Sequence, residues 1–347
     1  MADHSEILEQ WFQPNGMTDN ALVEQIRYRG SVQFARDLDA YLSGFEANMV
    51  PAADFDAGSH LSVDSATIRE WFSHEYAHYP LAQRRERILS RLKRVIETEA
   101  KVRKSKGISF DRKKAMQRLK AYERLWPDCR PLEVYREAVV ALGIAGPSEE
   151  NTRSKRTRKV HTGYTTVRRE ELPALVYLHT RLRGSDSSYM FDHVVIDEAQ
   201  DFSPFQVWVL KAFCPSNSFT ILGDTAQNIY SLYGISDWQA FSDLFEGKSQ
   251  KFTLDRSYRS TVEIIEFANS VLAEASVQET LAKPVFRSGE PVLVQTVPIR
   301  EQPRVIAEML SAWRAAGTQS AAVVTRTLAE GKRMADQLNA LGMEAHL

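Results

Sequence analysis

The chain has 347 residues, enough for two or three domains with hydrophobic cores of their own. Its hydrophobic content of 43% and charged content of 26% are ordinary for a globular protein, and no apolar run approaches the roughly 18 residues of a membrane span. The net charge of −1 means that any nucleic-acid-binding surface must be local. Cys129 and Cys214 fit no metal or redox spacing, and no signal-peptide pattern opens the chain, so a reducing cytoplasmic location without a membrane partner is expected.

The first 49 residues are predicted to be helical. Apolar residues recur at helical spacing over residues 7–12 and again over residues 22–26, with a Pro14-Asn15-Gly16 break between the two runs. A loop is expected over residues 51–59. A further helix should then start at Asp64 or Ser65.

Residues 74–78 have the sequence His-Glu-Tyr-Ala-His, which matches the HExxH pattern of zinc proteases. In such enzymes both histidines bind zinc from one helical face and the glutamate activates water. The continuations that would supply a third ligand are absent, since Leu81 replaces a required glycine and Lys101 stands four residues after Glu97. Two partly exposed histidines on an amphipathic helix are the favoured interpretation, and zinc proteolysis through His74 and His78 is the remote alternative.

Residues 81–126 form a long basic stretch in which apolar residues keep a helical spacing on both sides of Gly107-Ile108-Ser109. This arrangement predicts two helices joined as a protruding hairpin. Two interpretations stay open. The hairpin is either a solvated helix pair with a charged face, or a surface for nucleic acid or for a partner that itself handles nucleic acid. The polar residues 147–161 are expected to form an exposed loop.

The most informative segment is residues 191–201, Phe-Asp-His-Val-Val-Ile-Asp-Glu-Ala-Gln-Asp. Its run from His193 to Ile196 predicts a buried parallel strand flanked by helices. Asp197 and Glu198 follow where the strand should end, and ligands bind at the carboxyl ends of strands in open α/β sheets. One carboxylate could hold Mg²⁺ while its neighbour orients or deprotonates a water that attacks a phosphate. The alternative is a strand that runs into an acidic loop.

Two further blocks follow this segment. Residues 219–222 predict a second strand, which leads into Gly-Asp-Thr-Ala-Gln-Asn-Ile-Tyr over residues 223–230. Residues 254–260 are Leu-Asp-Arg-Ser-Tyr-Arg-Ser. Together with residues 194–201, these blocks resemble motifs II, III and IV of superfamily 1 helicases of the UvrD/Rep type, in the family's order and spacing.

This resemblance implies a phosphoryl-transfer site that uses ATP and Mg²⁺. On the family pattern, Asp197 would hold Mg²⁺ and Glu198 would position the attacking water. Gln227 would sense the γ-phosphate and couple it to a second domain. Arg259 would reach the transferring phosphoryl group as an arginine finger, a role worth roughly 10³–10⁵ in rate.

The sequence departs from the family at three points. No G-x-x-x-x-G-K-[ST] loop occurs, so nothing cradles the β- and γ-phosphates, and little or no ATP hydrolysis by this chain alone is expected. Motifs V and VI have no counterpart. Where UvrD/Rep helicases carry an Arg-Trp-Arg run, residues 231–234 are Ser-Leu-Tyr-Gly. Base stacking is worth about 1–3 kcal/mol per base, and Tyr233 could provide it in place of the missing tryptophan.

The basic insertion ahead of motif II also resembles HelD, a family of helicase-like ATPases that bind bacterial RNA polymerase and release it from nucleic acid. This likeness implies a central fragment with the RNA polymerase core as partner; the alternative is an ATP-dependent 3′–5′ DNA helicase with DNA as partner. The implied fold class is α/β, with RecA-like P-loop NTPase domains and a mainly helical insertion. The expected domains are a helical part of the first RecA-like domain (1–49), the insertion (50–165), the motif II and III half (166–250) and a truncated second RecA-like domain (251–347).

Overall fold

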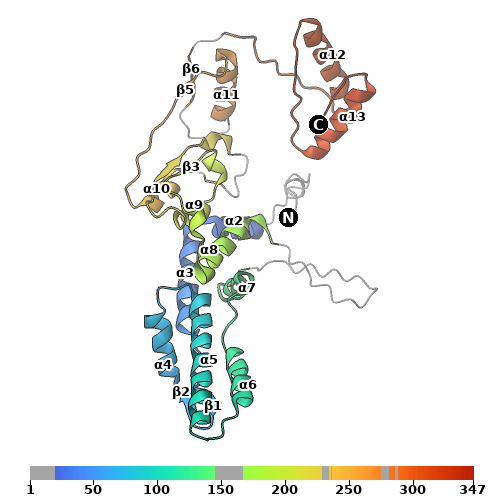
Figure 1. Cartoon of the computed structure of the whole chain (residues 1–347). Helices are drawn as coiled ribbons and strands as arrows, with labels where there is room; N and C mark the ends of the chain where they lie inside the picture. The colour runs from blue at the N-terminus through green and yellow to red at the C-terminus, as the bar shows by residue number, and fades with distance from the viewer. Residues whose placement is uncertain (1–19, 145–166, 229–233, 236, 275–280, 286–287) are drawn as a thin grey trace. The chain divides into compact units, whose positions relative to one another are not determined.

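The computed structural model describes residues 20–144, 167–228, 234–235, 237–274, 281–285 and 288–347 (Figure 1). These residues form two compact units, which meet in the sequence between Gln250 and Lys251. Both units are rich in helices, and each sheet in the described ranges has two strands. None of the described helices combines the length and the apolar character needed to cross a bilayer.

Helices make up most of the first unit. The helical expectations for residues 20–49 and 81–126 are confirmed, and residues 170–183, whose apolar spacing also predicts a helix, form one from Leu172 onward. The run at residues 7–12 lies outside the described residues. Asp64 caps the helix predicted to start near it, because its side chain accepts a hydrogen bond from the Thr67 amide. The helices are α2 (Asn20–Gly30), α3 (Val32–Ala47), α4 (Ser65–Glu70), α5 (Leu81–Ser105), α6 (Arg112–Glu123), α7 (Pro131–Ala141), α8 (Leu172–Arg183), α9 (Pro204–Lys211) and α10 (Gln239–Ser242).

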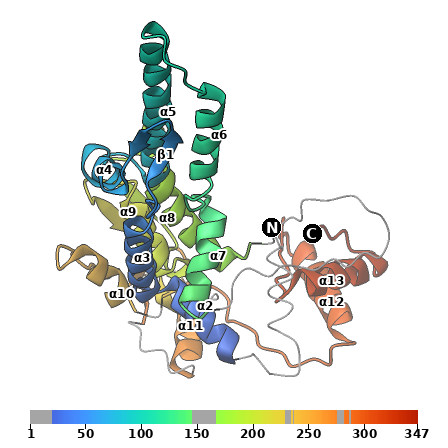
Figure 2. The ribbon, with the colours of Figure 1, turned by 90° about the horizontal axis from the view of Figure 1, so that it is seen from below.

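The predicted hairpin of α5 and α6 is present, and the two helices lie side by side in both views (Figures 1 and 2). Its base packs into the main core of the unit. Residues of α3, α7, α8 and α9 belong to the same core. Within it, the rings of Phe34 and Phe205 pack edge to face, with 5.6 Å between their centroids. The long helix α5 is therefore anchored along one face by aliphatic residues that recur at helical spacing.

Residues 55–58, the second half of the loop expected over residues 51–59, are instead the first strand of a small antiparallel hairpin. Strand β1 (Phe55–Gly58) pairs with β2 (Leu61–Val63), and positive φ angles at Ser59 and His60 make the tight turn. Phe55 and Ala57 alternate inward and are buried, and the Phe55 ring lies 5.4 Å from that of Tyr122 in α6. The strand was missed because a four-residue element shows too little alternation.

A parallel pair of strands forms the second structural centre of this unit. β3 (Val194–Ile196) aligns with β4 (Phe219–Ile221), Val194 opposite Phe219. Helices α9 and α10 cover one face, so Ile196 is buried. The other face leaves Val195 62% exposed, which corrects the prediction of a strand buried on both sides. The reason is that no described helix packs on that face, where His193 bridges Ser218 and Thr220.

The second unit contains helices α11 (Val262–Glu274), α12 (Gln302–Ala315) and α13 (Leu328–Ala340). They confirm the helices that apolar spacing predicts over residues 262–272, 301–315 and 328–341. Its strands β5 (Arg256–Ser257) and β6 (Lys283–Pro284) are parallel and only two residues long. The apolar, β-branched segments 292–296 and 321–325 have the composition of strands, and the sequence alone predicts strands there, but neither forms one. Neither segment pairs with another strand in the described ranges, and Val324 is 91% exposed. The reason is that an apolar run becomes a strand only where a neighbouring strand accepts its hydrogen bonds.

Candidate functional site

The ends of β3 and β4 bring two loops of the first unit together. Beyond the last paired residues, the Leu222 amide donates to the Ile196 carbonyl and the Ala199 amide donates to the Leu222 carbonyl, each at 2.8 Å. These bonds continue the parallel ladder into the loops. The segments after each strand, residues 197–201 and 223–228, therefore lie against one another at the carboxyl edge, where α/β sheets place their ligands.

Asp197 and Glu198 are both exposed at this edge. The Asp197 Oδ1 accepts a hydrogen bond from the Glu198 amide at 2.9 Å. Glu198 adopts a left-handed backbone conformation with φ of +50°, which non-glycine residues rarely adopt and which is found at strained functional turns. This turn separates the two carboxyl groups and directs the chain into the short 3₁₀ turn Ala199–Asp201.

Gln200 links the two loops. Its side chain is only 3% exposed, its Nε2 donates to Glu198 Oε2 at 2.8 Å, and its Oε1 accepts from the Asp224 amide at 3.0 Å. Its backbone carbonyl accepts a third bond from the Ile235 amide at 3.2 Å. A buried amide with both ends paired fixes the position of Glu198 relative to the loop after β4.

Asp224 carries the connection onward to Gln227. The Asp224 Oδ1 accepts from the Ala226 amide at 3.0 Å and so caps the 3₁₀ turn Thr225–Gln227. Its Oδ2 accepts from Gln227 Nε2 at 2.8 Å. A continuous chain of side-chain and backbone hydrogen bonds therefore runs from Glu198 through Gln200 and Asp224 to Gln227.

Two glycines allow this close packing. A Cβ atom at Gly223 would lie 2.4 Å from Gln200 Oε1 and 2.9 Å from the Ala199 amide nitrogen. A Cβ atom at Gly234 would lie 1.8 Å from the Gln200 carbonyl oxygen. Both distances are far below van der Waals contact, so only glycine fits at either position without moving the backbone around Gln200.

Asp201 differs from the exposed carboxylates of the same loop. Burial raises the pKa of its carboxyl above the ordinary value, and the positive charge of Arg169 opposes part of that rise. Its Oδ1 is enclosed and accepts no hydrogen bond from the described residues. Asp201 therefore keeps a proton more readily than an ordinary aspartate and is less suited than Asp197 to hold a cation.

The structure thus brings together three of the predicted site residues: Asp197, Glu198 and Gln227. Arg259 lies in the second unit, directly before α11, where it is exposed and makes no ion pair within the described ranges. The sequence alone allows Arg259 a purely structural role as well, in a salt bridge at the start of the helix that follows, and no such salt bridge is formed within the described ranges. Tyr233 lies outside the described residues.

Asp197 has the properties of a Mg²⁺ ligand. Its Oδ1 accepts the Glu198 amide, and its Oδ2 accepts no bond from the described part of the chain. Mg²⁺ is commonly bound through one or two carboxylates together with substrate phosphates and water. Across the described ranges, no group of three or more His, Cys, Asp or Glu residues could hold a metal by itself. The site offers an open carboxylate and not a complete protein cage.

The HExxH segment does not form a zinc-protease helix. Residues Trp71–Glu75 form a π-helix, and a turn follows, so His78 does not share a regular helix with His74. Glu75, the residue that would activate water, forms an ion pair with Arg91. The alternative of zinc proteolysis through His74 and His78 is therefore wrong in its structural premise.

Gln200 and Asp224 are the site residues that the sequence analysis missed. The signal was present, because an amide lies between the acidic residues of segment 197–201 and an aspartate follows directly after Gly223. Sequence spacing cannot show that the two loops meet, since they are 24 residues apart along the chain.

Part of this region matches known proteins. Residues 177–243 match the model of the UvrD/REP helicase N-terminal domain. The ATP-dependent DNA helicase srs2 of Schizosaccharomyces pombe is 39% identical over 85 residues, which are 24% of this chain and 10% of that protein. DNA helicase II of Haemophilus influenzae is 33% identical over 103 residues, 29% of this chain and 14% of that protein. ATP-dependent DNA helicase UvrD2 of Mycobacterium tuberculosis is 39% identical over 84 residues, 23% of this chain and 12% of that protein. The chain spans between 10% and 14% of these relatives, and the matched segment is of the UvrD-like superfamily 1 helicase type.

Proposed function

We propose that the first unit carries the acidic half of an ATP-hydrolysing site, and that the protein works as an ATP-driven motor of the UvrD/Rep type on DNA. One observation carries this proposal. The hydrogen-bond chain from Glu198 through Gln200 and Asp224 to Gln227 connects an exposed carboxylate to a second loop at the same sheet edge. A strand that merely ran into an acidic loop would not need a buried amide between them.

Each residue has a separate role in this proposal. A bound Mg·ATP supplies the electrophilic phosphoryl group and the cation that neutralises it. The free Oδ2 of Asp197 would hold the cation. Glu198, oriented by Gln200, would accept the proton of the attacking water, and Gln227 would pass a change in its own position back to Glu198 through Asp224. Arg259, from the second unit, would supply the positive charge for the transition state.

The nucleotide part of the proposal is tested by titration with a fluorescent ATP analogue, with and without Mg²⁺. The change Asp197→Asn should abolish the Mg²⁺-dependent component of binding, because an amide oxygen is a weaker ligand for a hard cation. Asp192→Asn is the matched control, since this aspartate is exposed ahead of the same strand. Equal loss of Mg²⁺-dependent binding in both variants would contradict the proposed site.

A second candidate partner is RNA polymerase, as in HelD, and the charges of the α5–α6 hairpin favour it over a nucleic-acid contact by that hairpin. Six of its arginines already pair with carboxylates of the first unit, which reduces the positive charge that the hairpin can offer to a phosphate backbone. They are Arg84, Arg85, Arg91, Arg103, Arg112 and Arg118. A hairpin of this kind is suited to contact a protein.

The two partners are separated by measuring binding to single-stranded DNA and to bacterial RNA polymerase core across a salt series. The DNA proposal expects affinity that falls steeply with salt and declines when Tyr233 is changed to alanine, whereas Tyr189→Ala serves as an exposed tyrosine control. Tight polymerase binding together with weak DNA binding would instead support HelD-type remodelling. With either partner, the second unit would belong to a second RecA-like domain that carries Arg259.

A further inference from the structure

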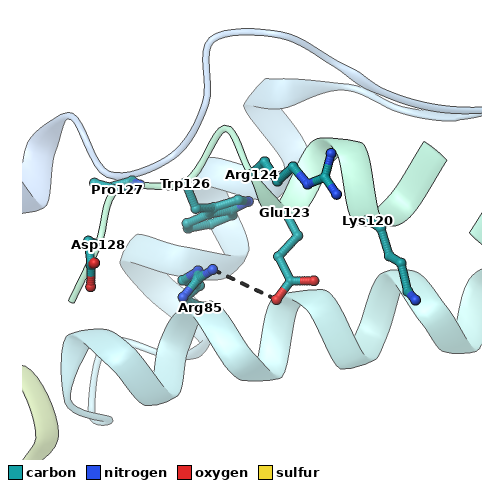
Figure 3. Close-up of a pocket in the computed structure, with 7 residues that line it drawn as sticks. All are labelled: Arg85, Lys120, Glu123, Arg124, Trp126, Pro127 and Asp128. Atoms are coloured by element: carbon teal, nitrogen blue, oxygen red, sulfur yellow. Dashed lines mark ion pairs between the residues drawn. The ribbon is translucent and has the colours of Figure 1, made fainter. Parts of the chain in front are cut away.

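A hollow of about 480 Å³ lies between α5 and the segment that follows α6 (Figure 3). Its wall contains the ring of Trp126, and Arg85 reaches into it from α5 (Figure 3). Lys120 and Arg124 come from the last turns of α6. Since no residue of the strand-end site lines it, this hollow is unrelated to nucleotide chemistry.

The charges in the hollow are unbalanced. Lys120 and Arg124 are exposed and have no ion-pair partner in the described part of the chain. Arg85 is held only loosely, with 3.8 Å between its guanidinium and Glu123 Oε1. The other acidic group at the hollow, Asp128, is paired with Arg130, at 2.6 Å between Oδ2 and a guanidinium nitrogen. Three cations therefore face one carboxylate that is available to them.

Two buried donors in the hollow lack acceptors. Trp126 is 5% exposed, and its indole N–H donates to no described residue. The Nε–H of Arg85 is enclosed and likewise donates to nothing in the described ranges. Both atoms are closed off from the surface of the hollow, so the groups open to a ligand are the terminal guanidinium nitrogens of Arg85 and the charges of Lys120 and Arg124.

We propose that this hollow binds a carboxylate side chain of an acidic segment on a partner protein. The carboxylate would replace Glu123 as the partner of Arg85 and would draw on the charges of Lys120 and Arg124, while its aliphatic stem lies against Trp126. A phosphate backbone is the less suitable ligand, because the hollow contains Glu123 and sits on a hairpin whose other arginines are mostly neutralised. This site is independent of the proposed nucleotide function.

The test measures binding of a fluorescein-labelled poly-glutamate peptide to the full chain by fluorescence anisotropy. Reversing both exposed charges with K120E/R124E should weaken binding about tenfold or more, which corresponds to about 1.4 kcal/mol. The control K113E/K114E makes the same charge change at the first turn of the same helix, outside the hollow, and should change affinity less than twofold. Equal losses in the two variants would show general attraction and overturn the proposal.

A second variant addresses the donor. Arg85→Gln removes the guanidinium with which the incoming carboxylate would pair, so peptide affinity should fall about threefold to tenfold, in line with the loss of one hydrogen bond between charged groups. An unchanged affinity in a variant with unchanged thermal unfolding contradicts the proposed contact. Oligothymidylate and unlabelled poly-glutamate are then compared as competitors of the labelled peptide, at equal concentrations of negative charge. If oligothymidylate displaces the labelled peptide at the lower concentration, the hollow is a phosphate site instead.

Discussion

Gln200 offers the most direct test of the strand-end site. Replacing it with leucine keeps a side chain of similar size in a position that is 3% exposed but removes the amide. Two hydrogen bonds are lost, one to Glu198 Oε2 at 2.8 Å and one from the Asp224 amide at 3.0 Å. The bond from Ile235 to the Gln200 backbone carbonyl is retained, so the change isolates the side chain.

The two lost bonds do not cost the same. The Asp224 amide is partly buried and would be left without its acceptor, which costs about 1–3 kcal/mol. Glu198 is exposed, so water takes the place of the amide there, and this part adds less than about 1 kcal/mol. The expected loss of local stability is therefore about 2–3 kcal/mol.

Hydrogen exchange of peptides that cover β4 and the loop after it reports this loss locally, without assuming that the two units unfold together. A loss of 2–3 kcal/mol should speed exchange about 30- to 150-fold under conditions where opening is an equilibrium. Gln227→Leu is the matched control, because Gln227 is exposed and its single bond to Asp224 is worth little. Exchange within threefold of the unaltered chain, or equal acceleration by the control, refutes the reasoning.

Three further changes test the surrounding structure. Gly223→Ala should lower the free energy of unfolding of the first unit by about 1–3 kcal/mol, because the new Cβ overlaps with Gln200. Gly44→Ala, on an open face of α3, should raise this free energy by about 0.5–1 kcal/mol. Thermal unfolding of the two variants measures both effects. Glu198→Gly should relieve about 1 kcal/mol of left-handed backbone strain and raise the melting temperature while nucleotide binding weakens, and a lower melting temperature contradicts this account. Burial raises the pKa of the Cys129 thiol to about 11, above its value of 9.0 in the unfolded chain. The contribution of this group to the free energy of unfolding is therefore fully present below pH 9.0 and is lost as the pH rises toward 11. The urea midpoint should fall with pH over this window, and it should fall less steeply in Cys129→Ala.

The helices of this protein could be predicted because each repeats its apolar pattern over several turns. The buried residues of α5 keep the helical spacing from Leu81 to Ile96 and those of α6 from Ala115 to Tyr122, and Asp64 carries a capping side chain at the expected position. The strands were less accessible to this reasoning. The segments 292–296 and 321–325 have the composition of strands, but composition does not provide the neighbour to which a strand must bond.

The candidate site was predictable in its parts and not in its connections. Asp197, Glu198 and Gln227 could be selected because motif spacing and residue chemistry point to them. The role of Gln200 depends on a long-range contact, which only the parallel register of β3 and β4 creates. The fit of Gly223 against Gln200 has the same origin.

The π-helix at Trp71–Glu75 has a consequence for chains of different length. Its wide turn, closed by a 2.9 Å bond from the Tyr76 amide to the Trp71 carbonyl, accommodates one residue more than an α-helical turn. Related chains one residue shorter here should therefore form an uninterrupted α-helix, in which the residue equivalent to Glu75 is rotated away from Arg91. Alignments should place a single gap at the exposed Ser73, and the glutamate and arginine should be gained or lost together with that extra residue.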